Sequence, residues 1–134
     1  MINDQDKSAL IKYRLEQAKE TIKEVNKLIE NDLLKIAVNR IYYGIYYSLI
    51  ALALKHNFQT TKHLQLIGWF NREFVRRNLI SLKYGKILRD TFKNRTDGDY
   101  APFIEFEKED VLAMYTEMKD FITRIEKLIK SEVE

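Results

Sequence analysis

The sequence predicts an all-α fold, an up-and-down helical bundle of four main helices plus a shorter fifth helix. One proline and four glycines in 134 residues leave few positions that favour turns, so long helices are expected. Apolar residues recur at steps of three and four, the period of an amphipathic helix, and no segment alternates as a strand does. The length suits one hydrophobic core, so we expect residues 1–134 to form a single helical domain.

The first helix is expected from Asp6 to about Asn31. Between Leu10 and Ile29 the apolar residues follow helical steps, and Lys, Glu and Arg fill the positions between them. Asp4 or Asp6 is the candidate N-cap, and a carboxylate at this end also interacts favourably with the helix dipole.

The central helix is expected from Leu33 to Leu54, with Asp32 as its candidate cap. Only two formal charges, Lys35 and Arg40, interrupt a stretch that is apolar or aromatic on nearly every face, which is typical of a buried helix. The stretch is long enough to cross a membrane, but its two charges, its asparagine and its four tyrosines make it a poor span. The short break before it makes the first two helices antiparallel neighbours.

A third helix is expected after the loop Phe58–Thr61. Thr60 or Thr61 is the candidate cap, and the helix ends around Asn78. Its aromatic and aliphatic residues follow a helical stripe, so it contributes one face to the core.

The fourth helix is expected to begin near Leu82 and to be terminated by the segment Arg95–Tyr100. Gly98 suits the left-handed conformation that often closes a helix. Ala101–Phe106 contains the only proline and is expected to be an extended loop. Acidic residues then open a last helix, which continues to about Lys130.

The positive charge is concentrated in one quarter of the chain. Residues 62–95 hold nine basic residues against two acids, whereas residues 96–134 hold five against eleven and the whole chain has a net charge of +3. Two interpretations remain open. The basic segment is either an electrostatic footprint for a polyanion or acidic partner, or a solvated face that balances the acidic C-terminal helix.

The sequence lacks the residues that several classes of functional site require. The chain has no cysteine, which excludes disulfides and thiolate metal sites and makes a reducing cytoplasm the expected compartment. Its two histidines form no ligand-spaced pair, and its glycines form no phosphate-binding loop. We therefore expect no metal site and no cofactor, and no ordinary hydrolase, kinase or dehydrogenase. The N-terminus has no pattern of a signal peptide.

The first group of residues that could carry chemistry lies on the central helix. Asn39 and Arg40 are followed by Tyr43 and Tyr47, one and two turns further on. A guanidinium is expensive to bury without a partner. Either Arg40 therefore faces a wet groove with these tyrosines, or an acid elsewhere in the chain neutralises it within a buried polar network.

The second group is Arg95 and Tyr100, with Asp97 and Asp99 between them. A fixed arginine beside a phosphodiester stabilises an oxyanion, and a tyrosine can donate a hydrogen bond to it. In the structural alternative, Asp97 or Asp99 is the acid that neutralises Arg40. The third group, Lys62–His63, opens the third helix, where a histidine is either an acid–base group or only a capping or surface residue.

The pattern Ala37-x-Asn39-Arg40-x-Tyr42-Tyr43-Gly44, followed by an apolar run, resembles the signature helix of the HEPN domains (higher eukaryotes and prokaryotes nucleotide-binding). The nearer resemblance is to their small single-domain prokaryotic branch, in which a His, a Phe-x-x-x-Phe-Val segment and an Arg-x-x-x-Asp-Tyr segment follow in order. The matching residues here are His63, Phe70 with Phe74–Val75, and Arg95 with Asp99–Tyr100.

This resemblance implies a helical bundle that forms a homodimer through its central helices. Many such proteins are encoded beside minimal nucleotidyltransferases and act with them as toxin and antitoxin. The active toxins are metal-independent ribonucleases with an Arg-x(4–6)-His motif. Arg95 matches that arginine, but the residue five positions on is Tyr100, and no histidine follows Arg95. By the same resemblance, Tyr100 is a candidate acceptor for AMP.

We therefore expect a cytoplasmic HEPN-like homodimer with a polar groove lined by Asn39, Arg40, Arg95 and Tyr100. Its expected role is to act with a nucleotidyltransferase partner, as a toxin–antitoxin component or as a nucleotide- or RNA-binding module. One alternative is a metal-independent ribonuclease in which Arg95 stabilises charge and His63 is the acid–base group. The other is a helical scaffold whose basic third and fourth helices dock an acidic protein.

Overall fold

The computed structural model describes residues 3–101 and 103–131, and over these residues the all-α prediction is confirmed. Five α-helices follow one another, and a π-helical segment continues the third; no strand occurs in the described ranges. The elements are α1 (Asp4–Glu30), α2 (Leu34–Lys55), α3 (His63–Phe70), the π-helical segment (Asn71–Val75), α4 (Leu82–Tyr100) and α5 (Lys108–Ser131).

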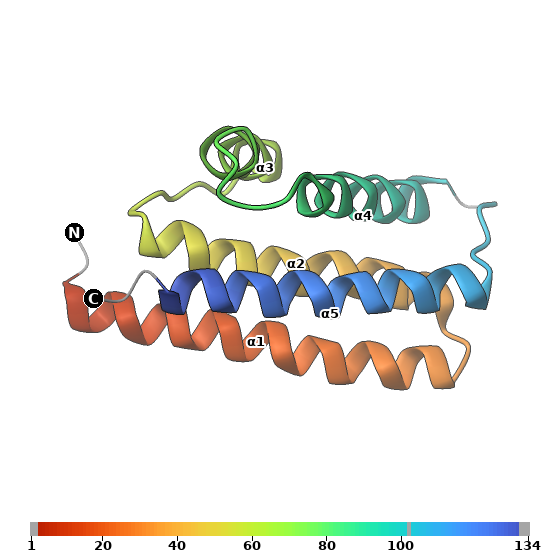
Figure 1. Cartoon of the computed structure of the whole chain (residues 1–134). Helices are drawn as coiled ribbons and strands as arrows, with labels where there is room; N and C mark the ends of the chain where they lie inside the picture. The colour runs from red at the N-terminus through yellow and green to blue at the C-terminus, as the bar shows by residue number, and fades with distance from the viewer. Residues whose placement is uncertain (1–2, 102, 132–134) are drawn as a thin grey trace.

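The helix α2 lies at the centre of the molecule. It packs against α1 and α5, which also contact each other so that the three helices form a bundle, and against α4 and α3 on another side (Figure 1). The helices α1 and α2 are antiparallel, α5 runs in the same direction as α2, and α3 lies across their common axis (Figure 1). No helix of the described residues is long and apolar enough to cross a membrane.

The buried residues of α2 explain its central place. Its fully buried side chains face α1, α5 and α4 in turn, as expected for a helix that is apolar on most faces. Gly44 sits at the closest approach of three helices, because a Cβ at this position would collide with Met118 of α5 and lie 3.2 Å from Thr21 Cγ2 of α1. A larger residue here would therefore force the end of the Met118 side chain to move and would crowd Thr21.

Three expected helix caps are wrong. The N-cap of α1 is Asn3, whose side chain accepts a hydrogen bond from the backbone N–H of Asp6, so the two aspartates lie in the first turn instead. Asp32 adopts a left-handed conformation with φ 56° and turns the chain, and Leu33 begins α2 without a side-chain cap. At α3 the cap position is Lys62; its N–H bonds to the Thr60 hydroxyl, which stabilises the approach to the helix.

The expected end of the fourth helix is also wrong. Residues 95–100 continue α4, and no described glycine has a positive φ, so Gly98 is helical. Ion pairs one turn apart, Lys93 with Asp97 and Arg95 with Asp99, favour the helix over the turn that this glycine and its neighbours suggest. The glycine has a packing role instead, since a Cβ on it would lie 3.2 Å from Phe106 Cε2.

Candidate functional site

One face of α2 is only half-buried, and it carries a stripe of polar and aromatic side chains. Asn39, Tyr43, Tyr46 and Ile50 recur at helical steps along this face and are all partly exposed. The helix α3 brings His63 to this stripe, and α4 brings Arg95 and Asp99. The candidate site is therefore assembled from three helices that are far apart in the sequence.

Arg95 reaches the stripe from α4. Its Nη2 donates to the Tyr43 hydroxyl at 3.1 Å, and its Cζ lies 5.8 and 5.4 Å from the ring centres of Tyr42 and Tyr43. The side chain is 18% exposed, and its Nε lies 3.1 Å from Asp99 Oδ2 in an ion pair. The Nε–H nevertheless makes no hydrogen bond within the described residues, because the direction of that contact is poor. The guanidinium thus retains donor capacity that the fold does not use.

Asp99 links α4 to α2 through a side-chain amide. Asn39 Nδ2 lies 3.3 Å from both carboxylate oxygens, while the same carboxylate holds Arg95. Asn39, Arg95 and Asp99 therefore form one connected polar group, as the sequence pattern suggested for the first two. The amide and the carboxylate together fix the position of the guanidinium over the tyrosine rings.

His63, the first residue of α3, enters the same site from the opposite side. Its Nδ1 lies 2.6 Å from the Tyr42 hydroxyl, and its ring stacks on Tyr46 with a centroid distance of 4.3 Å and an interplanar angle of 9°. Burial, and then the positive charge of Arg95, lower the pKa of His63. The imidazole is therefore mainly neutral near neutral pH.

The bond between Tyr42 and His63 selects one tautomer of the imidazole. Tyr42 is fully buried, and burial and then Tyr46 raise the pKa of its hydroxyl, although Arg95 opposes the change. Within residues 3–101 and 103–131 its hydroxyl bonds only to His63, so a phenol that accepted this bond would leave its own proton without a partner. We infer that Tyr42 donates to Nδ1 and that Nε2 carries the imidazole proton.

The expected partner of Arg40 is wrong. Arg40 Nε donates to Glu24 Oε1 of α1 at 2.9 Å, whereas Asp97 pairs with Lys93 and Asp99 with Arg95. The reason is topological, because the antiparallel arrangement of α1 and α2 places Glu24 beside Arg40.

Arg40 nevertheless borders the candidate site through its aromatic contacts. Its Cζ lies 5.6 Å from the ring centre of Tyr43 and 5.9 Å from that of Tyr47. The ring of Tyr43 is therefore contacted by two guanidiniums, those of Arg40 and Arg95.

Tyr100 does not join the group. Its side chain is 76% exposed at the end of α4, and it has no polar or ring contact within the described residues. Asp97 also lies apart, paired with Lys93 on the outer face of the helix. Of the four residues expected to line one groove, Asn39 and Arg95 therefore meet through Asp99, Arg40 lies beside them through the ring of Tyr43, and Tyr100 lies apart.

For two side chains of the site, the sequence predicts no separate role. Tyr42 was only part of a pattern, and Tyr46 was one of four tyrosines on the central helix. Their helical spacing places both beside Tyr43, but only the position of α3 reveals that they hold His63. Across the described part of the chain, no cluster of three or more His, Asp or Glu residues is arranged to hold a metal ion.

Comparison with known proteins identifies a family and several relatives. The model of the HEPN domain matches residues 11–128. The chain is 36% identical to a UPF0332 protein of Thermotoga maritima over 125 residues, which cover 93% of this chain and 95% of that protein.

Two proteins of Methanocaldococcus jannaschii are also similar. One, named "Putative toxin MJ0605", is 34% identical over 90% of this chain and 89% of its own length. The other, named "Putative toxin MJ0142", is 25% identical over 88% of this chain and 80% of its own length.

Proposed function

This chain belongs to the HEPN domain family, and we propose that it is a toxin-like protein that binds RNA at the site formed by Arg95 and His63. The observation that carries the proposal is the convergence of these two side chains, from α4 and α3, on Tyr42 and Tyr43 of the central helix. Two relatives named as toxins support the toxin-like role.

The chemistry of the site suits a phosphodiester. Arg95 supplies a positive charge, and the inferred tautomer of His63 supplies a neutral Nε2–H donor. Lys62, next in sequence to His63, makes no ion pair within the described residues. The partly exposed rings of Tyr43 and Tyr46 offer surfaces on which unpaired bases stack, as single-stranded RNA requires.

A second candidate function is cleavage of RNA without a metal ion. No histidine follows Arg95 in the sequence, but the fold places His63 close to Arg95. This proximity supplies the histidine that a cleavage site needs beside its arginine. In such a reaction Arg95 would stabilise negative charge on the phosphate oxygens. The hydrogen bond from Tyr42 leaves the neutral imidazole with no free lone pair to act as a base, so binding is favoured over cleavage.

Labelled RNA without added metal tests both functions. We expect the wild-type protein to bind an unpaired oligoribonucleotide without cleaving it, with an affinity that falls linearly in log–log terms as salt rises. Arg95→Ala should abolish most of this binding. Arg89→Ala is the matched control, since Arg89 lies on the same helix with an exposed side chain.

Cleavage that disappears in Arg95→Ala would establish the second function in place of the first. Equal binding by the wild type and Arg95→Ala would contradict both. Binding that does not respond to salt would favour an apolar docking surface on a scaffold protein.

We also propose a nucleotidyltransferase partner and a homodimer. The exposed hydroxyl of Tyr100 is accessible to an enzyme that transfers AMP. Incubation with a minimal nucleotidyltransferase and ATP should add the mass of one AMP to the wild type and none to Tyr100→Phe. Light scattering of the purified protein should give twice the mass of the 16.0 kDa chain.

A further inference from the structure

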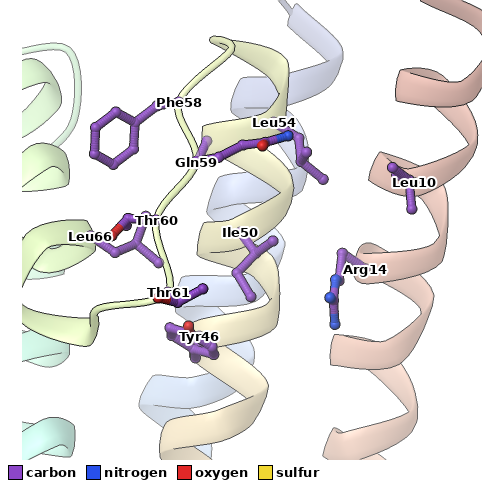
Figure 2. Close-up of a pocket in the computed structure, with 11 residues that line it drawn as sticks. Leu10, Arg14, Tyr46, Ile50, Leu54, Phe58, Gln59, Thr60, Thr61 and Leu66 are labelled. Atoms are coloured by element: carbon purple, nitrogen blue, oxygen red, sulfur yellow. The ribbon is translucent and has the colours of Figure 1, made fainter. Parts of the chain in front are cut away.

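A groove with a volume of about 370 Å³ lies beside the candidate site, between α1, the second half of α2 and the loop that leads to α3 (Figure 2). Its lining is mainly apolar, with Ile50 and Leu54 of α2 on one side and Leu10 of α1 facing them (Figure 2). A concave, mainly apolar surface of this size with a few polar groups is typical of a small-ligand site.

The polar groups of the groove are available to a ligand. Arg14 Nη1 donates to Gln17 Oε1 at 2.9 Å, but Arg14 makes no ion pair within the described residues, and no carboxylate lines the groove. Gln59 and Thr61 lie along the loop edge (Figure 2), and their side chains make no hydrogen bond within the described part of the chain. An amide, a hydroxyl and a guanidinium therefore surround an aliphatic floor.

The groove and the Arg95–His63 site share one wall. Tyr46 lines the groove, and its ring also stacks on His63 at 4.3 Å. Along α2, the seven residues from Tyr43 to Ile50 correspond to a rise of about 10 Å. A strand whose phosphate lies at Arg95 would therefore have a neighbouring base within reach of the groove.

We propose that this groove is a base-binding subsite that takes one unpaired nucleobase of the RNA strand held at Arg95 and His63. The inference rests on the proposed function. The flat face of the base lies on Ile50 and Leu54, and its polar edge meets the Gln59 amide and the Thr61 hydroxyl. The absence of a lining carboxylate and the charge of Arg14 suit the anionic backbone on either side of the base.

Two ligands of equal charge isolate the contribution of the base. One is a short unpaired oligoribonucleotide, and the other is an abasic ribose–phosphate chain of the same length. The wild type should bind the first at least about tenfold more tightly, since burial of one base face against apolar side chains contributes roughly that factor. Ile50→Trp fills the groove and should reduce this preference several-fold, leaving the part that stacking on Tyr43 and Tyr46 contributes.

Matched variants separate a filled groove from a damaged fold. Ile36→Trp makes the same substitution at a half-exposed position near the start of α2 and should retain the tenfold preference. Gln59→Ala combined with Thr61→Ala leaves the helices untouched and should reduce the preference several-fold. An unchanged preference in both Ile50→Trp and this double variant would overturn the proposal.

Failure of the proposed function gives a different result from failure of the subsite. If Arg95→Ala binds both ligands like the wild type, the assignment of the phosphate site is wrong, and the base preference still tests the groove.

If the wild type binds neither ligand, methyl NMR with uridine and adenosine monophosphates tests the groove directly. Shifts at Ile50 and Leu54 would support the subsite, whereas no shifts would overturn it. A loss of dimer mass in Ile50→Trp with the base preference unchanged would also overturn it, in favour of contact between copies.

Discussion

Arg40 and Arg95 both hold a guanidinium near the ring of Tyr43, but their other contacts differ. Arg40 bonds to Glu24 on the neighbouring α1, and 49% of that carboxylate side chain is exposed. Arg95 is less exposed than Arg40, pairs with Asp99 one turn along its own helix, and leaves its Nε–H without a hydrogen bond in the described residues. The first arginine joins two helices at the surface, whereas the second lies beside His63 within the site.

The comparison shows why an arginine in a family-like pattern is ambiguous evidence of function. Both arginines lie in family-like patterns, and both looked equally suited to a groove. Their surroundings distinguish them, because Arg95 contacts the same tyrosine rings as His63, whereas Arg40 is joined to α1 through Glu24. We therefore assign phosphate binding to Arg95 and a mainly structural contact to Arg40.

The largest expected effect separates the two arginines in RNA binding. Arg95→Ala should weaken the affinity for an unpaired oligoribonucleotide by roughly 10- to 150-fold, the effect of losing a hydrogen-bonded charged group. Arg40→Met should change it less than about threefold, because Glu24 already uses its Nε. Fluorescence anisotropy at one fixed salt concentration measures both, and an equal loss in both variants would remove the distinction.

The next largest effect concerns the hydrogen bond that orients His63. Tyr42→Phe keeps the buried ring but removes the hydroxyl, so Nδ1 loses its donor and the tautomer is no longer fixed. RNA affinity should fall about fivefold, the value of a typical hydrogen bond. Nitrogen-15 NMR of His63 should show a protonated Nε2 in the wild type and a tautomer mixture in the variant. A protonated Nδ1 in the wild type would contradict the inferred direction of the bond.

A smaller effect is expected in the way the free energy of unfolding depends on pH. His63 faces Tyr42, Tyr43 and Tyr46 from α2 and Arg95 from α4, and its folded pKa lies below the ordinary value. On acidification the unfolded chain therefore binds the proton first, and the free energy of unfolding falls as pH drops below about 6.5. Chemical denaturation should show a shallower fall for His63→Gln. An identical pH profile would show that this group does not contribute.

The smallest effect is the stability cost of removing Arg40. Arg40→Met should lower the free energy of unfolding by about 1 kcal/mol or less, because Glu24 is half-exposed and water screens the pair. A loss of about 3–5 kcal/mol is the value expected for a buried pair and would mean that Arg40 is structurally indispensable. Urea denaturation of this variant, beside Arg95→Ala, gives the comparison directly.

Helical periodicity was sufficient to predict the helices, because each one buries a single stripe or, for α2, most of its surface. The ends were harder to predict. Gly98, with an aspartate on each side, has the composition of a turn, yet two ion pairs one turn apart keep α4 helical to Tyr100. Local composition cannot weigh these contacts against the intrinsic preference of one glycine.

The candidate site was only partly predictable for a different reason. Asn39, Arg95 and His63 were recognised from a pattern, but their convergence depends on how α3 crosses the bundle. The partner of Arg40 depends on the register between α1 and α2, which the sequence does not specify for a single glutamate. Tyr42 could be identified as a positioning residue only from its distance to His63.

The most direct test of the central claim follows the side chains of both arginines and His63 during binding. Arginine Nε–H and histidine nitrogen signals can be recorded by NMR while an unpaired oligoribonucleotide is added without metal. We predict large shifts for Arg95 and for His63 Nε2, with the Arg40 signal nearly unchanged. Shifts confined to Arg40, or to surface lysines with Arg95 and His63 unmoved, would contradict the assignment of the phosphate site.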